Sequence, residues 1–270
     1  MAEPALSEIE IGATGLAVRL RGATKVYDNG VAALGPFDLD VISGEFVSLL
    51  GPSGCGKSTA LRLIAGLTTP SSGEVSVSHS PSKTSGQRSI GFVFQEPTLM
   101  PWASVRDNVC LPLKLSHVPE KEADARIAEV LAQVGLADFA DAFPRELSGG
   151  MKMRVSLARA LVTDPDILLM DEPFAALDEI TRFRLNNDLL TLWRNLHKTV
   201  IFVTHSVFES VYLSQRVVVM TSRPGRISSE FRIDTSEPRV EDFRMSAGYA
   251  AYCRDVSKAL TPSYPGLSGV

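Results

Sequence analysis

The segment at residues 51–59 constrains the fold of this chain more strongly than any other feature of the sequence. It matches the pattern G-x-x-x-x-G-K-[ST], in which glycines let backbone N–H groups wrap around a phosphate and a lysine adds a positive charge. At ordinary residue frequencies, a chance match in a chain of this length has a probability on the order of one percent. The residues of this predicted phosphate loop are Gly51, Pro52, Ser53, Gly54, Cys55, Gly56, Lys57, Ser58 and Thr59.

The residues on either side of the loop have the patterns that the motif requires, a strand before it and a helix after it. Residues 46–50 form a short, mostly apolar run that is typical of a buried strand and ends at the loop. Apolar residues between Leu61 and Ala65 then recur at helical spacing, and Gly66 is placed to end the helix. We therefore expect a strand, the phosphate loop and a helix in this order.

Three more short apolar runs predict a parallel core sheet and an α/β fold. They lie at residues 167–170, 200–203 and 217–220. Continuous apolar runs of this length are typical of strands that are covered on both faces. All are far shorter than the roughly 18 residues that a membrane-spanning helix needs. We therefore do not expect the chain to cross a bilayer by itself.

Two smaller regions are expected to join the core sheet in one domain at residues 17–230. Residues 21–41 are rich in strand-forming residues, with Asp28-Asn29-Gly30 as a hairpin turn, and predict an antiparallel β subdomain. Residues 99–146 predict an inserted helical subdomain, because a proline, acidic residues and a glycine stand where a helix would begin and end.

The two ends of the chain are expected to lie outside this domain. Residues 1–16 are interpreted as an N-terminal extension, in which acidic residues stand where a signal peptide would have a basic segment. Residues 231–270 are expected to form a C-terminal extension with a short helix. No residue pattern in that extension predicts chemistry.

Polar residues directly follow two of the predicted strands. Asp171 and Glu172 come after residues 167–170, and His205 comes after residues 200–204. Because the carboxyl ends of parallel strands meet at one edge of a sheet, these side chains are expected near the phosphate loop. Asp171 would face a Mg²⁺ ion, Glu172 would act as a base toward water, and His205 would contact the terminal phosphate. The alternative is structural, since an acidic pair often caps a helix and a lone histidine often only packs.

The charge balance argues against nucleic acid as the main partner. The chain has 31 acidic and 27 basic side chains, a formal net charge of −4, and so lacks the basic excess of most nucleic-acid-binding domains.

The three cysteines, Cys55, Cys110 and Cys253, fit neither a disulfide framework nor the spacing of a metal site. We therefore expect a reducing compartment.

A further motif makes the sequence resemble the ATP-binding cassette (ABC) family over residues 18–226. Leu147-Ser148-Gly149-Gly150-Met151 resembles the family's signature, which contacts the nucleotide held by a second, facing subunit. A serine and two glycines at a helix start suit this task, because free N–H groups and the positive end of the helix would face an anion. Taken alone, these residues would be an ordinary helix N-cap.

Four other positions resemble functional residues of the family. Gln95, within Phe94-Gln95-Glu96-Pro97, is similar to the glutamine that touches the metal and links the core to the helical subdomain. Asp178 ends Ala176-Leu177-Asp178, which resembles a loop at the dimer interface, and His205 matches the switch histidine. Tyr27 resembles the aromatic residue that stacks on adenine, although a half-buried strand tyrosine is the alternative.

The resemblance also implies the cofactors, ATP and Mg²⁺, with Ser58, Gln95 and Asp171 around the metal.

Four positions depart from common family residues. Met151 and Met153 replace glutamines on the signature helix, Ala175 replaces a serine, and Ser206 replaces an acid after the switch histidine. The signature serine and glycines are intact, but the hydrogen bonding between subunits is left open by these changes.

Three stretches narrow the resemblance to the nitrate/sulfonate/taurine import branch of the family. They are Gln95-Glu96-Pro97 with Met100-Pro101-Trp102, Val211-Tyr212-Leu213, and Arg223-Pro224-Gly225-Arg226-Ile227. The branch implies transmembrane permease subunits, a second copy of this chain in an ATP-sandwich dimer, and indirectly an extracytoplasmic solute-binding protein. The chain would then be a peripheral ATPase on the cytoplasmic face of the inner (plasma) membrane, and the solute would be small and anionic or sulfonate-like.

Two other classes of protein share part of this pattern. A soluble ABC-type ATPase in a non-transport machine, acting on DNA or ribosomes, usually has a coiled-coil insertion or a second cassette, and this sequence shows neither. A phosphate-loop kinase for a small metabolite would explain the loop but not Gln95 or Ser148. We therefore predict an ATPase that energises an importer.

Overall fold

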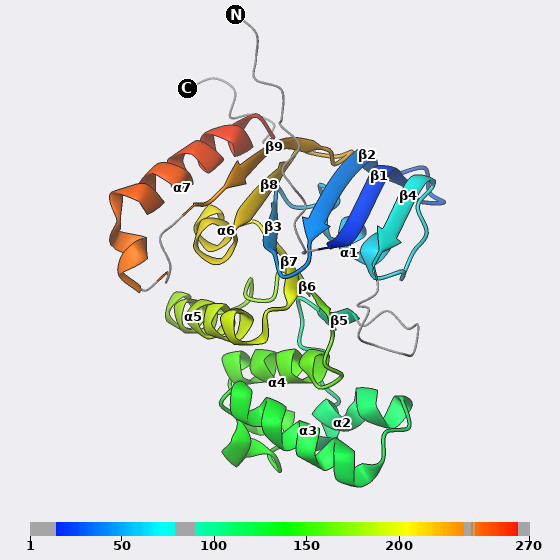
Figure 1. Ribbon diagram of the computed structural model, residues 1–270, viewed down its shortest axis with the longest axis vertical. Coiled ribbons are helices and arrows are strands. Elements are labelled where there is room, and N and C mark those ends of the chain that lie inside the picture. Colours follow the sequence, from blue (N-terminus) through cyan, green and yellow to red (C-terminus); the bar gives the residue numbers. More distant parts are fainter. Residues whose placement is uncertain (1–14, 79–89, 235–238, 240, 264–270) are drawn as a thin grey trace, which may run out of the picture.

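Two sheets form the framework of the computed structural model, which describes residues 15–78, 90–234, 239 and 241–263 (Figure 1). The six-stranded sheet has the order β5-β6-β7-β3-β8-β9, and the three-stranded sheet has the order β2-β1-β4. The larger sheet contains β3 (Phe46–Leu50), β5 (Ile90–Val93), β6 (Ile167–Asp171), β7 (Thr199–Thr204), β8 (Arg216–Met220) and β9 (Ile227–Arg232). The smaller sheet contains β1 (Leu16–Val26), β2 (Ala32–Ile42) and β4 (Ser72–Val77).

The larger sheet is parallel from β5 to β8, and only β9 runs antiparallel to its neighbour. Successive residues of its central strand enter two different hydrophobic cores, because Phe46 and Leu50 belong to one and Val47 and Leu49 to the other. Both faces of the strand are therefore covered, which explains its continuous apolar sequence. The predicted parallel core sheet, with an antiparallel sheet beside it, is confirmed.

The helices are α1 (Lys57–Ile64), α2 (Val105–Leu115), α3 (Glu120–Gln133), α4 (Gly149–Leu161), α5 (Glu179–Leu196), α6 (Val207–Leu213) and α7 (Ala247–Leu260). Short 3₁₀ turns lie at Ala137–Phe139, Pro144–Glu146, Glu241–Met245 and Thr261–Ser263. α1 lies between the two sheets, since its buried side chains share a core with β1 and β2. Buried residues of α5, α6 and α7 belong to the core on the other face of the large sheet.

α2, α3 and α4 form a helical group at one end of the molecule (Figure 1). The buried Asn108 fixes the entry of the chain into this group. Its amide nitrogen donates to the carbonyl oxygens of Met100, Ala103 and Ser104 at 3.2, 3.1 and 2.9 Å, and its amide oxygen accepts from the backbone N–H of Met100 at 2.8 Å. A turn held by four such bonds gives the segment after β5 a defined path to α2.

The C-terminal part of the chain packs on the large sheet and on α6. β9 extends past residue 230 and pairs with β8, so the strand belongs to the core sheet. α7 lies against α6, where the hydroxyl of Tyr249 donates to the carbonyl oxygen of Phe208 at 3.0 Å. Of residues 1–16, expected as an N-terminal extension, residues 1–14 lie outside the described residues, and β1 already begins at Leu16. Among the described helices, none has both the length and the apolar character that crossing a membrane requires.

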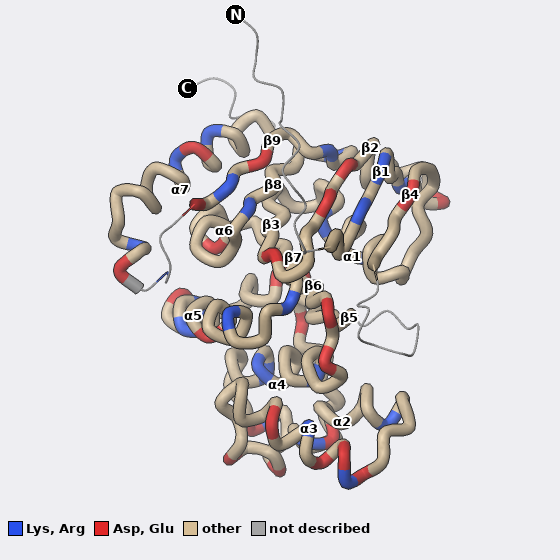
Figure 2. Tube along the Cα trace, in the orientation of Figure 1, with Lys and Arg blue, Asp and Glu red and all other residues tan. Residues whose placement is uncertain are grey.

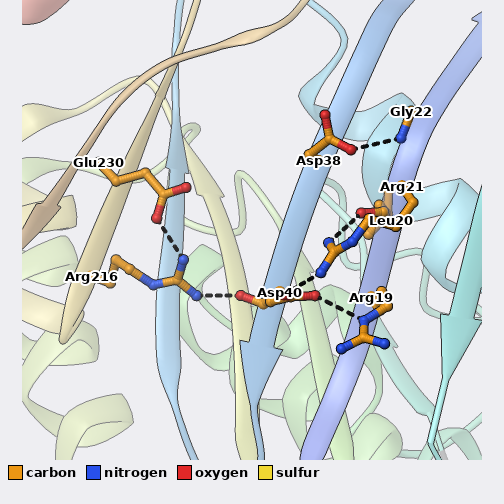
Figure 3. A network of polar contacts seen from close by, with 8 residues as sticks. All are labelled: Arg19, Leu20, Arg21, Gly22, Asp38, Asp40, Arg216 and Glu230. Carbon is orange, nitrogen blue, oxygen red and sulfur yellow. Dashed lines mark hydrogen bonds and ion pairs between the residues drawn. The ribbon is translucent and has the colours of Figure 1, made fainter. Parts of the chain in front are cut away.

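Arg216 at the start of β8 joins the two sheets (Figure 3). Its guanidinium donates to Glu45 at 2.8 Å, to Glu230 of β9 at 2.7 Å and to the carbonyl oxygen of Asp40 in β2. The Asp40 carboxylate in turn accepts from Arg19 and Arg21 of β1. Elsewhere, basic and acidic residues are interspersed along the trace (Figure 2).

Candidate functional site

The order of the core strands brings three polar segments to one edge of the sheet. β6, β7 and β3 are neighbours and parallel, so their carboxyl ends lie side by side. Asp171 and Glu172 stand at the end of β6, His205 follows β7, and the phosphate loop follows β3. This is the edge at which open α/β sheets bind ligands.

The phosphate loop has the backbone that its glycines permit. Gly54 and Gly56 have φ angles of +74° and +107°, and a Cβ atom on Gly56 would lie only 2.5 Å from the carbonyl oxygen of Ala33. Neither position tolerates a side chain without strain. Gly56 precedes α1, whose first turn contains no acidic residue, so the positive end of this helix is free to face an anion.

Lys57 is held in place under the loop. Its side chain is almost completely buried, and Nζ donates to the carbonyl oxygens of Gly51 at 2.7 Å and Pro52 at 3.0 Å. Nζ also lies 3.4 Å from Oε1 of Glu172. A buried ammonium group of this kind needs such partners, and it gives the loop a fixed positive charge.

Ser58 and Asp171 provide oxygen ligands that fit a magnesium ion. Oγ of Ser58 donates to Oδ1 of Asp171 at 2.8 Å. Burial raises the pKa of Asp171, and the hydrogen bond from Ser58 opposes this shift. Among the described residues, no group of three or more His, Cys, Asp and Glu side chains is placed to hold a metal alone. The oxygens of Ser58 and Asp171 nevertheless fit Mg²⁺, which is usually bound by one or two protein oxygens together with phosphates and water.

Glu172 links the lysine to the histidine. Its Oε2 lies 2.9 Å from Nδ1 of His205, while Oε1 faces Lys57. Its backbone has a φ of +44°, unusual for a residue with a side chain, and its N–H donates to the carbonyl oxygen of Val203 in β7 at 3.0 Å. The bond to β7 therefore holds Glu172 in a strained backbone conformation of the kind found at functional sites.

A cavity of about 550 Å³ opens above the loop. Its lining includes many of the residues predicted from the sequence: Tyr27, Ser53, Gly54, Gly56, Lys57, Ser58, Thr59, Gln95 and Glu172. The hydroxyl of Tyr27 lies 3.3 Å from Oγ1 of Thr59, so this tyrosine stands at the edge of the loop. Tyr27 therefore reaches both the loop and the cavity.

Other lining residues were not predicted: Asn29, Val31, Ala33, Arg62 and Arg223. Ala33 carries no sequence signal, because it is a small apolar residue within a strand. Arg223 belongs to a stretch whose resemblance to the import branch gave it no role. Within the loop, the side chain of Cys55 is buried in the core and does not line the cavity. This burial raises the pKa of its thiol.

The predicted signature and Asp178 do not line this cavity. Oγ of Ser148 accepts from the backbone N–H of Met151 at 3.3 Å and caps α4, and Ser148 and Gly149 are exposed. Asp178 caps α5 by accepting from the N–H of Thr181 at 2.9 Å, a bond that lowers its pKa. At the start of α4, Ser148 and Gly149 are therefore exposed while Gly150 is buried, and none of the three lines the cavity of its own chain.

The two caps lie next to each other. A Cβ atom on Gly149 would lie 3.2 Å from the side chain of Leu177, and one on Gly150 would lie 2.7 Å from that of Thr181. The glycines therefore allow the start of α4 and the loop before α5 to approach closely. The segment around Gln95 is also tied to α4, because the Arg159 guanidinium donates to the carbonyl oxygens of Pro97 and Thr98 at 2.8 and 2.9 Å.

Comparison with known proteins gives one consistent result. A family model described as ABC transporter matches residues 34–175. The chain is 48% identical over 208 residues to the taurine import ATP-binding protein TauB of Rhizobium johnstonii, covering 77% of this chain and 79% of that protein. It is 43% identical over 236 residues to the nitrate import ATP-binding protein NrtD of Synechocystis sp., covering 85% and 88%.

Solved structures agree with these relatives. The fold matches the ATP-binding cassette MJ0796, determined as a dimer in a post-hydrolysis state bound to ADP and Pi, with a TM-score of 0.69 and 34% identity. The match covers 81% of this chain and 100% of that structure. The resemblance drawn from the sequence is thereby confirmed. From its fold, its phosphate loop and these matches, we conclude that the chain belongs to the ABC transporter family and is an ATP-binding subunit with ATPase activity.

Proposed function

We propose that this chain energises a membrane importer of a small anionic or sulfonate-like solute by hydrolysing ATP at the edge formed by β3, β6 and β7. The observation that carries the assignment of residues is the continuous set of contacts from Ser58 to Asp171 and from Lys57 through Glu172 to His205. The solute class is supported by the taurine and nitrate import relatives. A soluble non-transport ATPase has no such support among them.

Each residue of the set has a proposed task. Lys57 and the N–H groups before α1 bind the phosphates of ATP, and Tyr27 stacks on the adenine. Ser58 and Asp171, with Gln95 at the edge of the cavity, would hold Mg²⁺, which would supply positive charge to the phosphates. Glu172 accepts a proton from the attacking water, and His205 orients Glu172 and contacts the terminal phosphate.

The site is proposed to be completed by a second copy of the chain. Ser148, Gly149 and Gly150 do not line the cavity of their own chain, and the exposed helix start suits an anion from outside. Asp178 lies beside the signature and is proposed to join the same interface. The dimeric cassette with ADP and Pi supports this arrangement. ATP between two chains then favours the closed dimer, and hydrolysis removes that preference.

The closure of this dimer is proposed to act on transmembrane permease subunits at the cytoplasmic face of the membrane, and indirectly on an extracytoplasmic solute-binding protein. Trp102, just after the segment of Gln95, is 77% exposed, and large exposed apolar side chains suit a partner surface. Arg159 fixes the Gln95 segment to the signature helix α4. A partner seated near Trp102 would therefore sense both the nucleotide and the signature.

The test is to express the chain with its neighbouring permease subunits and purify it from detergent-solubilised membranes. We expect co-purification, and in lipid nanodiscs we expect ATPase activity that rises when binding protein loaded with taurine, an alkanesulfonate or nitrate is added. The Glu172→Gln variant serves as the inactive control. The proposal would be contradicted if the chain did not associate with the permease, or if none of the three solutes raised the ATPase activity.

A further inference from the structure

We propose that Arg223, in the loop between β8 and β9, is an additional nucleotide-binding residue that donates hydrogen bonds to the phosphates of ATP. The inference rests on the nucleotide site proposed above and adds to it a residue outside the phosphate loop and the motifs already assigned. It also gives a role to the stretch from Arg223 to Ile227, which had none.

The loop that carries Arg223 is packed directly on the phosphate loop. A Cβ atom on Gly225 would lie 2.0 Å from the carbonyl oxygen of Cys55, so only glycine allows this approach. The same residue is bonded to β2, because Gly35 donates to its carbonyl oxygen at 3.0 Å and its own N–H donates to Ala33 at 3.2 Å. The loop is therefore held in a fixed position relative to the nucleotide cavity.

Arg223 reaches the cavity with most of its donors unused. Nε donates to the carbonyl oxygen of Gly54 at 3.0 Å, and the side chain lines the cavity beside the loop. This is its one hydrogen bond to the residues that the structure describes, so the terminal nitrogens have no protein partner among them. A guanidinium has five N–H donors in a fixed fork, a geometry that matches phosphate oxygens.

The charges around the cavity also favour this role. Three cationic side chains line it: Lys57, Arg62 and Arg223. Lys57 lies 3.4 Å from the Glu172 carboxylate, and the charge of Arg62 acts on Asp171, whose pKa it helps to lower against the effect of burial. Within the described part of the chain, Arg223 has no carboxylate partner. It is therefore the cation whose charge is least compensated before a polyphosphate enters.

A purely structural role would give Arg223 a different behaviour. In that case its bond to Gly54 would only support the phosphate loop, and its loss would lower the stability of the protein without nucleotide. Arg226 provides a matched control. It lies in the same loop and is exposed, its side chain packs over Gly35, and it does not line the cavity.

The experiment is isothermal titration calorimetry of MgATP and MgADP with the purified chain and its Arg223→Ala, Arg223→Lys, Arg226→Ala and Lys57→Ala variants. We expect Arg223→Ala to raise the Kd of both nucleotides about tenfold or more, on the scale of one lost charge-assisted hydrogen bond. The Arg223→Lys variant should recover part of the affinity, and Arg226→Ala should bind like the unaltered chain. The salt dependence of the Kd should also be weaker in Arg223→Ala.

Several results would overturn the inference. Unchanged affinity in Arg223→Ala would do so, as would an affinity loss shared by Arg226→Ala. A fall in the melting temperature of the nucleotide-free Arg223→Ala variant, with affinity recovered at low temperature, would assign a structural role instead. The Lys57→Ala variant distinguishes a failure of the proposed nucleotide site from a failure of the role of Arg223 alone. If it binds ATP normally, the proposed nucleotide site itself is wrong; if only Arg223→Ala binds normally, the site stands and this inference fails.

Discussion

Oε2 of Glu172 lies 2.9 Å from Nδ1 of His205, across the ends of two neighbouring strands. Its other oxygen faces the buried ammonium of Lys57 at 3.4 Å. The carboxylate is thus held from two sides while its backbone is fixed to β7 by a bond to Val203. A group fixed in this way loses little freedom when a water molecule must be positioned beside it.

The Glu172→Gln variant is expected to hydrolyse ATP about 10²-fold more slowly or worse, because glutamine cannot accept the proton of the attacking water. Glutamine has nearly the same shape and can keep a hydrogen bond to His205, so ATP affinity should be retained. The measurement is steady-state phosphate release together with calorimetric titration of ATP. Near-normal turnover in this variant would show that Glu172 is not the base.

The His205→Ala variant is expected to lose about 10²-fold in turnover, within the range for one positioned hydrogen-bonding group. Because the proposed role of His205 works partly through Glu172, the two losses should not add. The double variant with Glu172→Gln should therefore hydrolyse ATP at nearly the rate of the slower single variant. A double variant whose loss equals the product of the two single losses would mean that the residues act independently.

The signature segment offers a test of the shared site by mixing variants. Chains with Lys57→Ala and chains with Ser148→Arg are each expected to be nearly inactive. A mixed dimer would contain one site with an intact phosphate loop from one chain and an intact signature from the other. The ATPase activity of the mixture should therefore exceed that of either variant alone. If mixing restores nothing while both variants still dimerise, the site belongs to a single chain.

The strands and the loop were predictable because their sequence signals are local. The run at residues 46–50, the glycines after it and the acidic pair after β6 each predict an element or a position without knowledge of the rest. Parallel pairing then brings strand ends together, so the neighbourhood of Asp171, Glu172 and the loop followed from one rule.

Other features depend on contacts between distant segments and were missed. β9 is a half-buried edge strand with a mixed sequence, and β5 has only 4 residues, so neither has a clear period. α2 lies within the predicted helical subdomain at residues 99–146, but its bounds were not predicted, because Pro112 inside it argues against a helix at the level of sequence. Arg223 approaches Gly54 across 169 positions of the chain, and no local pattern predicts that meeting.

The buried Glu209 on α6 provides a test of pH dependence. Its Oε2 accepts from the hydroxyl of Thr204, next to His205, at 2.6 Å, and Oε1 lies 3.7 Å from Nε of Arg182 on α5. Burial raises its pKa, although the Thr204 hydrogen bond and the Arg182 charge oppose the shift. A raised pKa in the folded state means that the ionised form costs stability, and the cost appears as the pH rises through that pKa.

The Glu209→Gln variant keeps an acceptor for Thr204 but does not ionise. Its melting temperature relative to the unaltered chain should therefore increase as the pH rises from about 4, the ordinary range of a glutamate, to about 8. The exposed Glu179→Gln on α5 serves as the control and should show no such trend. A difference that stays constant over this range, or that moves in favour of glutamate, would contradict the raised pKa.

Arg239 is expected to be the main anchor of the C-terminal segment. This buried guanidinium donates to the carbonyl oxygens of Tyr212, Ser214 and Ile233 at 3.1, 2.7 and 3.0 Å. Two of these carbonyls end α6 and the third follows β9, so one side chain satisfies backbone groups from both elements. Arg239→Ala leaves them without this donor inside the protein. We expect a loss of about 2–4 kcal/mol in the free energy of unfolding, measured by urea denaturation.

The exposed Arg232→Ala, in the same part of the chain, should change the free energy of unfolding by no more than about 0.5 kcal/mol. The Arg239→Ala variant should also show faster hydrogen exchange than the unaltered chain in α6 and α7, whereas exchange in β3 and β6 should change little. This pattern would mean that the C-terminal segment stabilises the region that follows His205. Uniformly faster exchange throughout the large sheet would instead mean that Arg239 supports the whole domain and has no specific relation to α6.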